Sequence, residues 1–235
     1  MQVTPAYDAV NNELLSLVPT NARRVVDVGC MLGSLGHAVR SRAPQTEFVG
    51  LDIDPDYAAA AARHCTETFA CDIEAVSPEL WERLFPSDCW IFGDSLEHLR
   101  NPWQVLRRVR DGIDADGCLL VCLPNAQHWS VQRNLASGHF RYQDSGLMDR
   151  THLRWFTRIT LLEMLQITGW QVEIGITRNL PPSAQQEVIL EALRGFAVAG
   201  GFDPEQAVLD AIPFQYVFKC VPNTDMPLTP LDANC

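Results

Sequence analysis

Residues 24–36 read Arg24-Val25-Val26-Asp27-Val28-Gly29-Cys30-Met31-Leu32-Gly33-Ser34-Leu35-Gly36, and this stretch decides the fold expected for the chain. Its first residues are rich in valine, which predicts a strand. The residues after Gly33 are compatible with a helix that ends before Pro44. Gly29 and Gly33 permit positive φ values and a close approach of a ligand to the backbone. The start of the helix would face that ligand with N–H groups, although an ordinary strand-to-helix turn explains the two glycines equally well.

Composition limits the class of protein. The chain has 235 residues, of which 47% are hydrophobic and 20% are charged, and this balance is typical of a globular domain. We expect one domain over residues 1–220 and a loose tail over residues 221–235. The formal net charge is −11, and Lys219 is the only lysine. Nucleic acid is therefore not expected as a partner, because binding to phosphates requires a basic face.

Targeting and metal signals are weak in the sequence. The first residues lack the charged and apolar regions of a signal peptide, and no apolar run approaches the roughly 18 residues of a membrane span. We expect a cytoplasmic protein without a membrane span. The eight cysteines are scattered and form no C-x-x-C pair, so they are expected to be reduced. Neither cysteines nor histidines have the spacing of zinc ligands, and no metal site is expected.

Apolar segments of strand length alternate with helix-compatible segments through the first half of the chain. The expected strands cover residues 25–28, 47–52, 68–71, 89–92 and 118–123. This alternation predicts a doubly wound α/β fold with a parallel sheet. Two further strands are expected at residues 170–174 and 214–218. The residues between them, 175–213, predict a helical insertion that covers an acceptor site or mediates homodimer formation.

Polar residues or glycines follow each of the first five expected strands. They are Gly29–Gly33, Asp52, Asp72, Asp94 and Asn125. In doubly wound sheets the ligand binds beyond the carboxyl ends of the strands, so these residues are expected to converge. Asp52 follows the glycine turn by about 20 positions, the spacing of an acid that binds ribose hydroxyls. A capping or solvated acid is the alternative for Asp52, and a turn residue is the alternative for Asp72.

Four successive motifs resemble those of the class I S-adenosylmethionine-dependent methyltransferases. They are Asp27–Gly33, Gly50–Pro55, Cys71–Glu74 and Phe92–Leu99, and their order and spacing match over residues 23–125. Met31 departs from the pattern, because the commonest form of the first motif has glycine there. A later segment, Asp149-Arg150-Thr151-His152-Leu153-Arg154-Trp155-Phe156-Thr157, resembles one found in a bacterial subset of the family. That subset is often associated with modification of sugars, lipids and surface polysaccharides.

The resemblance implies a seven-stranded, Rossmann-like sheet with an antiparallel last strand, and S-adenosylmethionine as the cofactor. It also implies a role for each matching residue. Along the cofactor these are Asp27, Gly29, Cys30, Met31, Leu32 and Gly33 for the amino acid end, Asp52 for the ribose, Ile53 for the adenine face, Asp72 and Ile73 for the adenine edge, and Asp94 and Leu96 near the methyl group.

The acceptor side is expected in the second half of the chain. Methyl transfer requires alignment of the acceptor, and a hydroxyl acceptor also requires a general base. Residues 126–150 are expected to form a long lid or binding loop. His152 is the expected general base or acceptor ligand, and the alternative is that His152 and Arg154 position the loop.

The resemblance implies methyl transfer to a small-molecule, sugar or lipid-linked acceptor, and we expect the methylated atom to be oxygen. Two other functions stay open at this point. One is an NAD-type, dinucleotide-binding oxidoreductase, and the other is a non-catalytic module that binds S-adenosylmethionine. The single glycine turn and the acid after the third expected strand favour the methyltransferase over the oxidoreductase.

Overall fold

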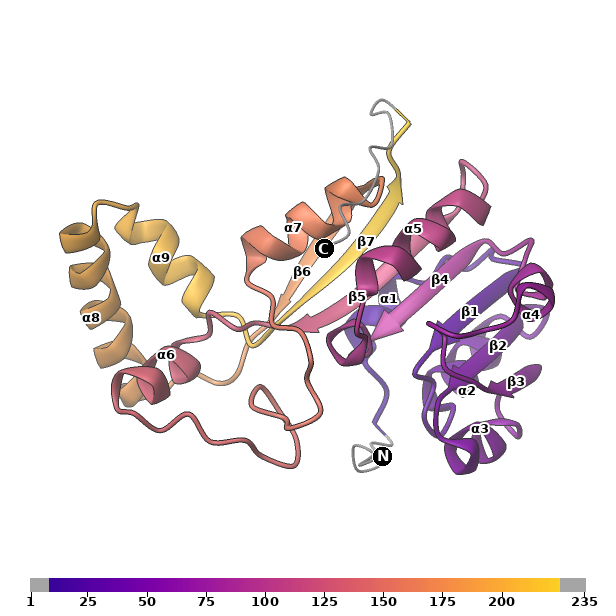
Figure 1. Cartoon of the computed structure of the whole chain (residues 1–235), viewed down its shortest axis with the longest axis horizontal. Helices are drawn as coiled ribbons and strands as arrows, with labels where there is room; N and C mark the ends of the chain where they lie inside the picture. The colour runs from indigo at the N-terminus through magenta and orange to yellow at the C-terminus, as the bar shows by residue number, and fades with distance from the viewer. Residues whose placement is uncertain (1–8, 225–235) are drawn as a thin grey trace.

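A computed structural model describes residues 9–224 of the chain, and a seven-stranded sheet forms its centre (Figure 1). The strands are β1 (Arg24–Val28), β2 (Glu47–Asp52), β3 (Glu67–Ala70), β4 (Cys89–Gly93), β5 (Cys118–Pro124), β6 (Trp170–Arg178) and β7 (Gln215–Pro222). The helices are α1 (Asn12–Leu17), α2 (Ser34–Arg42), α3 (Pro55–Ala61), α4 (Pro78–Arg83), α5 (Pro102–Gly112), α6 (Trp129–Ala136), α7 (Arg158–Ile167), α8 (Ala184–Gly200) and α9 (Pro204–Ala211), with a 3-10 turn η1 (Leu96–His98).

The strand order is β3-β2-β1-β4-β5-β7-β6. The first five strands run parallel to one another, and β7 runs antiparallel to both β5 and β6. The expected mostly parallel sheet with an antiparallel last strand is confirmed. The order reverses between β1 and β4, and ligands of doubly wound sheets bind at the carboxyl ends of the strands on either side of such a reversal.

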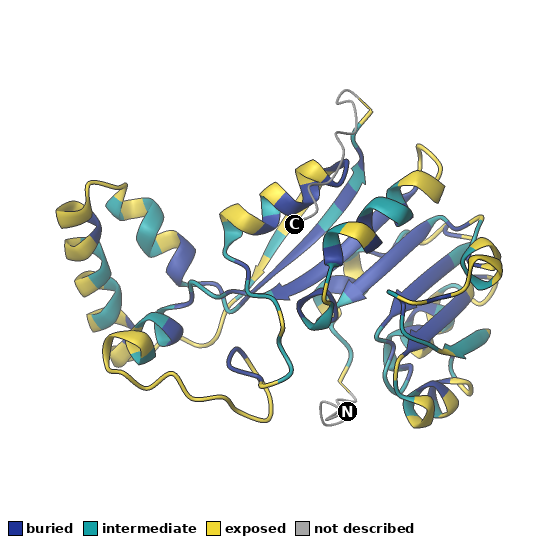
Figure 2. Cartoon of the chain, in the orientation of Figure 1, coloured by how far each residue is buried: buried dark blue, intermediate teal, exposed yellow. Residues whose placement is uncertain are grey.

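The central strands are buried on both faces, and a different set of helices covers each face. Successive side chains of a strand point to opposite faces. Val26 and Phe92 therefore belong to a core shared with α5 and α7, whereas Val25 and Ile91 belong to a core shared with α1, α2 and α3. In Figure 2 the middle of the sheet is dark blue, the colour of buried residues. The unbroken apolar strands in the sequence follow from this two-sided burial.

Helix α6 corrects the expectation of a structureless loop over residues 126–150. It spans Trp129–Ala136, and the side chain of His128 caps it by accepting a hydrogen bond from the amide of Ser130. Only Val131 is buried within the helix. One buried position in eight residues leaves no apolar periodicity, and this is why the sequence did not indicate a helix there.

The two last strands are longer than expected. β6 continues to Arg178, which pairs with Gln215, and β7 continues to Pro222, which pairs with Trp170. The expected starts of the insertion, at residue 175, and of the tail, at residue 221, are therefore too early. Pairing with the neighbouring strand sets these ends, and the sequence of either strand alone does not reveal it. The rest of the expected tail, from residue 225, lies outside the described residues.

Helices α8 and α9 lie between β6 and β7 in sequence and stand beside α6, beyond the carboxyl ends of β4 and β5 (Figure 1). Asn125 anchors them to the end of β5. Its Nδ2 donates to the carbonyl oxygens of Asp210 and Pro213, each at 2.8 Å. Arg158 at the start of α7 donates to the carboxylate of Asp210, with Nε 2.6 Å from Oδ1. Among residues 9–224, no helix is both long and apolar enough to cross a membrane.

Candidate active site

The turn after β1 and the end of β2 are in direct contact at the carboxyl edge of the sheet. Asp52 is the last residue of β2. Its Oδ2 accepts a hydrogen bond from the amide of Met31 at 2.9 Å, and its Oδ1 accepts one from the amide of Asp54 at 2.9 Å. The amide of Gly29 donates to the carbonyl of Leu51 at 2.8 Å. The sequence predicted that these two motifs meet, and the backbone hydrogen bonds show how they do.

Positive φ values shape the glycine turn. Gly29, Met31 and Gly33 have φ values of 82°, 47° and 78°. A Cβ at Gly29 would lie 3.0 Å from Cβ of Ser95, and one at Gly33 would lie 3.1 Å from Cα of Ala61. Met31 occupies the left-handed region at a cost of about 1 kcal/mol. The turn therefore keeps its conformation although Met31 replaces the usual glycine.

Most amides of this turn are already bonded within the protein. Besides the two amides described above, that of Cys30 donates to Leu51 at 3.0 Å and that of Gly33 donates to the carbonyl of Cys30 at 2.9 Å. Leu32, which lies between Met31 and Gly33 in sequence, is half-buried. The turn thus offers a ligand its shape and its carbonyl oxygens more than a row of free N–H groups.

Asp27 on β1 is a buried acid next to the turn. Only 4% of its surface is exposed. Burial and the nearby charge of Asp52 raise the pKa of Asp27 to about 7. A positively charged ligand group beside this carboxyl would offset both effects. The amino acid end of the implied cofactor carries such a group.

The residues predicted for adenine are placed unequally. The side chain of Ile53 is 47% exposed and is free to pack on a ring. Ile73 is 4% exposed and belongs to the core, so the structure leaves only its backbone for a ligand. The carboxylate of Asp72 accepts a hydrogen bond from Arg100 at 2.7 Å, and Arg100 also pairs with Glu74 at 3.2 Å. Asp72 is therefore oriented by an arginine that the sequence did not single out.

Asp94 and Leu96, predicted near the methyl group, differ in the same way. Asp94 follows β4 with a φ of 55° and keeps a solvent-exposed surface. The surrounding protein shields its carboxyl from water and raises its pKa to about 6, although the positive charge of Arg178 acts in the opposite direction. Gln215 on β7 donates a hydrogen bond to Oδ1 of Asp94. Leu96 is fully buried in the core, and this placement does not support a side-chain contact with the cofactor.

His152 lies against the end of β4. Its side chain is 7% exposed, and its Nε2 is 3.9 Å from Oε1 of Glu97 on η1. Its ring also meets the ring of His98, with centroids 4.9 Å apart. Burial and the neighbouring His98 lower the pKa of His152 to about 4. The imidazole is therefore neutral at pH 7 and only weakly basic.

A cavity of about 350 Å³ lies between α6 and the chain segment at residues 143–148. Its lining combines the aromatic rings of Trp129 and Phe214 with the polar side chains of Arg133, Asn134 and Gln143. Among the described residues, Nε1 of Trp129 is buried without a hydrogen-bond partner. An indole N–H of this kind is ready to donate to an oxygen of a ligand.

The position of this cavity connects it to the predicted cofactor residues. Phe214 in its wall precedes Gln215, which bonds to Asp94. The backbone carbonyl of Leu147, which also lines the cavity, accepts a hydrogen bond from the imidazole of His152. A smaller cavity of about 260 Å³ lies between α7 and β6, at the Trp170 end of that strand. The larger cavity is therefore the candidate for an acceptor.

Sequence reasoning missed several of these residues. Arg100, Glu97, Gln215 and Trp129 touch predicted site residues or line the cavity. Glu97 stands inside a quoted motif, and its apolar surroundings in the sequence were a signal of burial. Gln215 and Trp129 are separated from Asp94 by long stretches of chain, and their own sequence context carries no signal for the site.

Comparisons with known proteins agree with this arrangement. A family model described as "Methyltransferase domain" matches residues 26–119, from β1 to the start of β5. A trans-aconitate 2-methyltransferase of Methylobacterium nodulans is 27% identical over 85% of this chain and 78% of its own length. Over residues 26–119 the chain therefore carries a methyltransferase domain, and it is similar to S-adenosylmethionine-dependent methyltransferases.

Solved structures show the same fold at low sequence identity. Mitomycin 7-O-methyltransferase MmcR is 17% identical over 89% of this chain with a TM-score of 0.55, and the match spans 52%, about half, of its length. The O-methyltransferase of a trans-AT polyketide multienzyme of Brevibacillus brevis, in complex with S-adenosylhomocysteine, is 14% identical over 92% of this chain and 73% of its own, with a TM-score of 0.58. The matched methyltransferase domain and the relative from Methylobacterium nodulans favour an S-adenosylmethionine-dependent enzyme over the oxidoreductase and over a non-catalytic module.

Proposed function

We propose that this methyltransferase transfers a methyl group to an oxygen of a small polar acceptor bound between α6 and the rim of the sheet. The observation that carries the proposal is the continuity between cofactor residues and cavity. Asp94, Gln215 and Phe214 form an unbroken path from the predicted methyl end to the cavity wall. Bound S-adenosylmethionine supplies a methyl group on an activated sulfur leaving group.

The chain's own residues would bind and align the reactants. In the proposed arrangement Asp27 faces the amino group of the cofactor, Asp52 accepts hydrogen bonds from the ribose, and Ile53 packs on adenine. The turn at residues 29–33 follows the amino acid end by its shape. Asp72 and the backbone of Ile73 lie along the adenine edge. These residues fit the cofactor because the acids stand where hydroxyl and amino groups need acceptors.

The lining of the cavity supports a polar, oxygen-rich acceptor. Trp129 offers an aromatic face and an unpaired N–H donor, and Asn134 and Gln143 offer amide groups. A sugar hydroxyl or a carboxylate suits such a mixture, and Arg133 would favour an anionic acceptor. The relative from Methylobacterium nodulans is named for a small organic acid, and MmcR is named for an O-methylation. Small hydroxy acids and sugars, including lipid-linked ones, are therefore the proposed acceptors.

For His152 the structure supports the positioning role over proton transfer. Its side chain is almost enclosed, and its low pKa makes it a poor base. The backbone carbonyl of Glu97 accepts hydrogen bonds from the amides of Leu153 and Arg154 at 2.8 and 3.0 Å. These contacts hold the segment that carries His152 against the end of β4. We propose that this segment closes the acceptor side of the site.

Turnover with a labelled methyl donor tests the proposed function. The purified protein is incubated with S-adenosylmethionine labelled in the methyl group and with three acceptor sets: small organic acids, free and nucleotide-linked sugars, and lipid-linked sugars. We expect labelled product with one set, and Gln143→Ala and Asn134→Ala to raise KM for that acceptor without weakening donor binding. Donor binding without transfer to any set would contradict the acceptor proposal. Failure to bind the donor would contradict the cofactor site.

We also propose that the insertion mediates homodimer formation. Val188, Phe196 and Val198 on α8 are 69%, 67% and 66% exposed, and Figure 2 shows α8 with much of its surface in the colour of exposed residues. Exposed large apolar side chains favour association. Light scattering over a range of concentrations should report a dimer that Phe196→Ser dissociates, and a monomer at all concentrations would contradict the proposal.

All seven cysteines of the described residues are free, which suits the reducing cytoplasm.

A further inference from the structure

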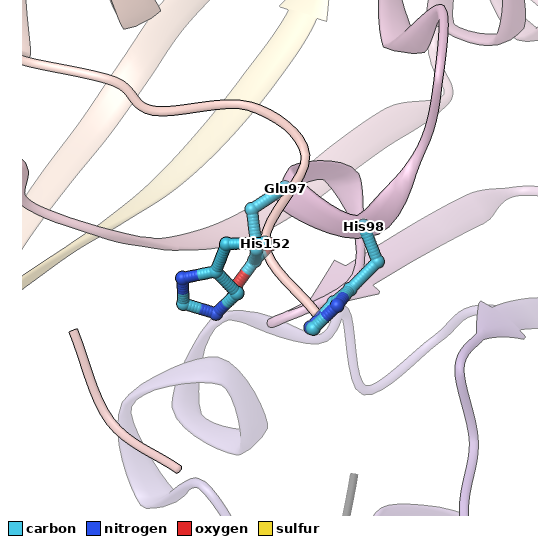
Figure 3. Close-up of side chains that lie close together, drawn as sticks. All are labelled: Glu97, His98 and His152. Carbon is cyan, nitrogen blue, oxygen red and sulfur yellow. The ribbon is translucent and has the colours of Figure 1, made fainter. Parts of the chain in front are cut away.

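Two histidines and one buried glutamate meet at the end of β4. Glu97 and His98 belong to η1, directly after the strand, and His152 comes from the segment after α6 (Figure 3). One ligand atom from each side chain lies within 4.8 Å of the others. Nε2 of His152 is 3.9 Å from Oε1 of Glu97. This separation is too long for a hydrogen bond, so no direct bond explains why the two groups face each other.

Both imidazoles are held by backbone groups on their outer sides. Nδ1 of His98 lies 3.2 Å from the carbonyl oxygen of Thr151 and 3.1 Å from its hydroxyl. That hydroxyl donates to Oδ1 of Asp149 at 2.6 Å. His152 donates to the backbone carbonyl of Leu147. A carbonyl accepts only, so it keeps the proton on the nitrogen that faces it and leaves a lone pair on the other nitrogen. Metal-bound histidines are typically oriented by such outer hydrogen bonds.

Glu97 lacks the compensation that a buried carboxylate needs. It is 1% exposed, and among the described residues its Oε2 has no hydrogen-bond partner. The acidic groups Asp94 and Asp149 also act on Glu97 and add negative charge around it. A buried, unpaired carboxyl is costly, and a cation between Glu97 and the two imidazoles would remove that cost. The orphaned oxygen is a second observation, independent of the clustering, and it also indicates a missing ligand.

We propose that Glu97, His98 and His152 bind one divalent transition-metal ion of the Zn²⁺ or Fe²⁺ type. Two neutral imidazoles and one carboxylate are the donors that these ions take in open, three-ligand protein sites. Mg²⁺ and Ca²⁺ prefer sets made of oxygen alone. Metal–ligand bonds of about 2.0–2.2 Å require the three side chains to draw together by about 1 Å. Small rotations of these side chains can supply that movement.

The site goes beyond the proposed methyl transfer and does not depend on it. An ion there would tie the segment at residues 149–155 to the end of β4, next to Asp94. The expectation of no metal site rested on the spacing of Cys and His pairs along the sequence. Here His98 and His152 are separated by 54 positions (152 − 98), and only the fold brings them together.

Metal binding to the purified chain tests the proposal without any activity measurement. The protein is stripped with a chelator and titrated with Zn²⁺ by calorimetry, and with Co²⁺ while visible d–d absorption is recorded. We expect one ion per chain, a Co²⁺ spectrum of a nitrogen- and oxygen-ligated ion, and no comparable binding of Mg²⁺. Loss of a ligand should weaken binding by more than about 100-fold, since losing an outer partner already costs 10–100-fold.

Three variants and one control separate this site from others. Glu97→Gln keeps the shape of the side chain, and His98→Asn and His152→Asn remove one imidazole each. His37→Asn is the matched control, because His37 and His64 form another histidine pair with ring centroids 4.8 Å apart. The proposal requires that the folded ligand variants lose the ion and that the control keeps it. No tight binding to the parent protein, binding that all three variants retain, or a thiolate-type Co²⁺ spectrum from the cysteines would overturn it.

Discussion

Replacement of Asp52 by alanine should separate the cofactor site from the stability of the fold. In the proposed site its carboxylate accepts two hydrogen bonds from the ribose. It also accepts hydrogen bonds from the amides of Met31 and Asp54, both at 2.9 Å. Asp52→Ala removes both sets. Asp52→Asn keeps the shape of the side chain but loses the charge and one acceptor oxygen.

The size of the effect follows from these contacts. A hydrogen bond to a charged group contributes about 1.5–3 kcal/mol, so two lost ribose contacts weaken binding by about 3–5 kcal/mol. This corresponds to a roughly 100- to 4,000-fold increase in Kd. Asp52→Asn should fall between the parent protein and Asp52→Ala. Loss of the partners of the two amides also costs the fold about 1 kcal/mol for each.

Asp54 provides a matched control two residues away. Its carboxylate caps α3 by accepting hydrogen bonds from the amides of Asp56 and Tyr57. Asp54→Ala should lower the free energy of unfolding by about 1 kcal/mol. It should leave cofactor affinity within about twofold, because the carboxylate of Asp54 bonds to α3 and makes no contact with the ribose in the proposed site. Calorimetry with S-adenosylhomocysteine and urea unfolding measure the two quantities. Equal affinities for the parent protein and a folded Asp52→Ala variant would refute the reasoning.

Three further predictions concern stability and are measured by urea unfolding. Gly33→Ala should lower the free energy of unfolding by about 2 kcal/mol or more, because the added Cβ would lie 3.1 Å from Ala61 in a residue with positive φ. Met31→Gly should leave the free energy of unfolding unchanged, because relief of the left-handed conformation offsets the added chain entropy. Equal losses in the two variants would contradict this prediction. Folding raises the pKa of Asp27 from 3.8 to about 7, so the folded state keeps this proton to a higher pH than the unfolded state does. The free energy of unfolding should therefore fall by on the order of 4 kcal/mol as the pH rises through that interval. Asp27→Asn should remove this fall, and the same pH dependence in both proteins would contradict the prediction. Asn125→Ala should lower the free energy of unfolding by about 3 kcal/mol, because it removes two donated hydrogen bonds and the acceptor of a third. It should also expose the α8–α9 insertion to limited proteolysis. An unchanged digestion pattern would argue against the anchoring role.

The sequence determined the sheet because each strand carries its own signal. Apolar runs such as that at residues 118–123 are bounded by glycine, proline or acids, and their alternation with helices leaves few topologies open. The glycine turn and Asp52 were predictable for the same reason: spacing within one strand–helix–strand unit sets their geometry. Helix α6 was not predictable, because one buried residue, Val131, produces no periodic pattern.

The tertiary structure decided which predicted residues face a ligand. Ile53 and Ile73 occupy similar places after neighbouring strands, yet one is 47% exposed and the other 4%. Core packing makes that difference, and neither residue's sequence context records it. The same holds for Glu97, whose proximity to His98 and His152 depends on contacts between segments far apart in the chain. Local patterns determine where strands, turns and caps form, because those interactions span a few residues. Burial, charge pairing and the meeting of distant side chains arise only when the whole chain packs.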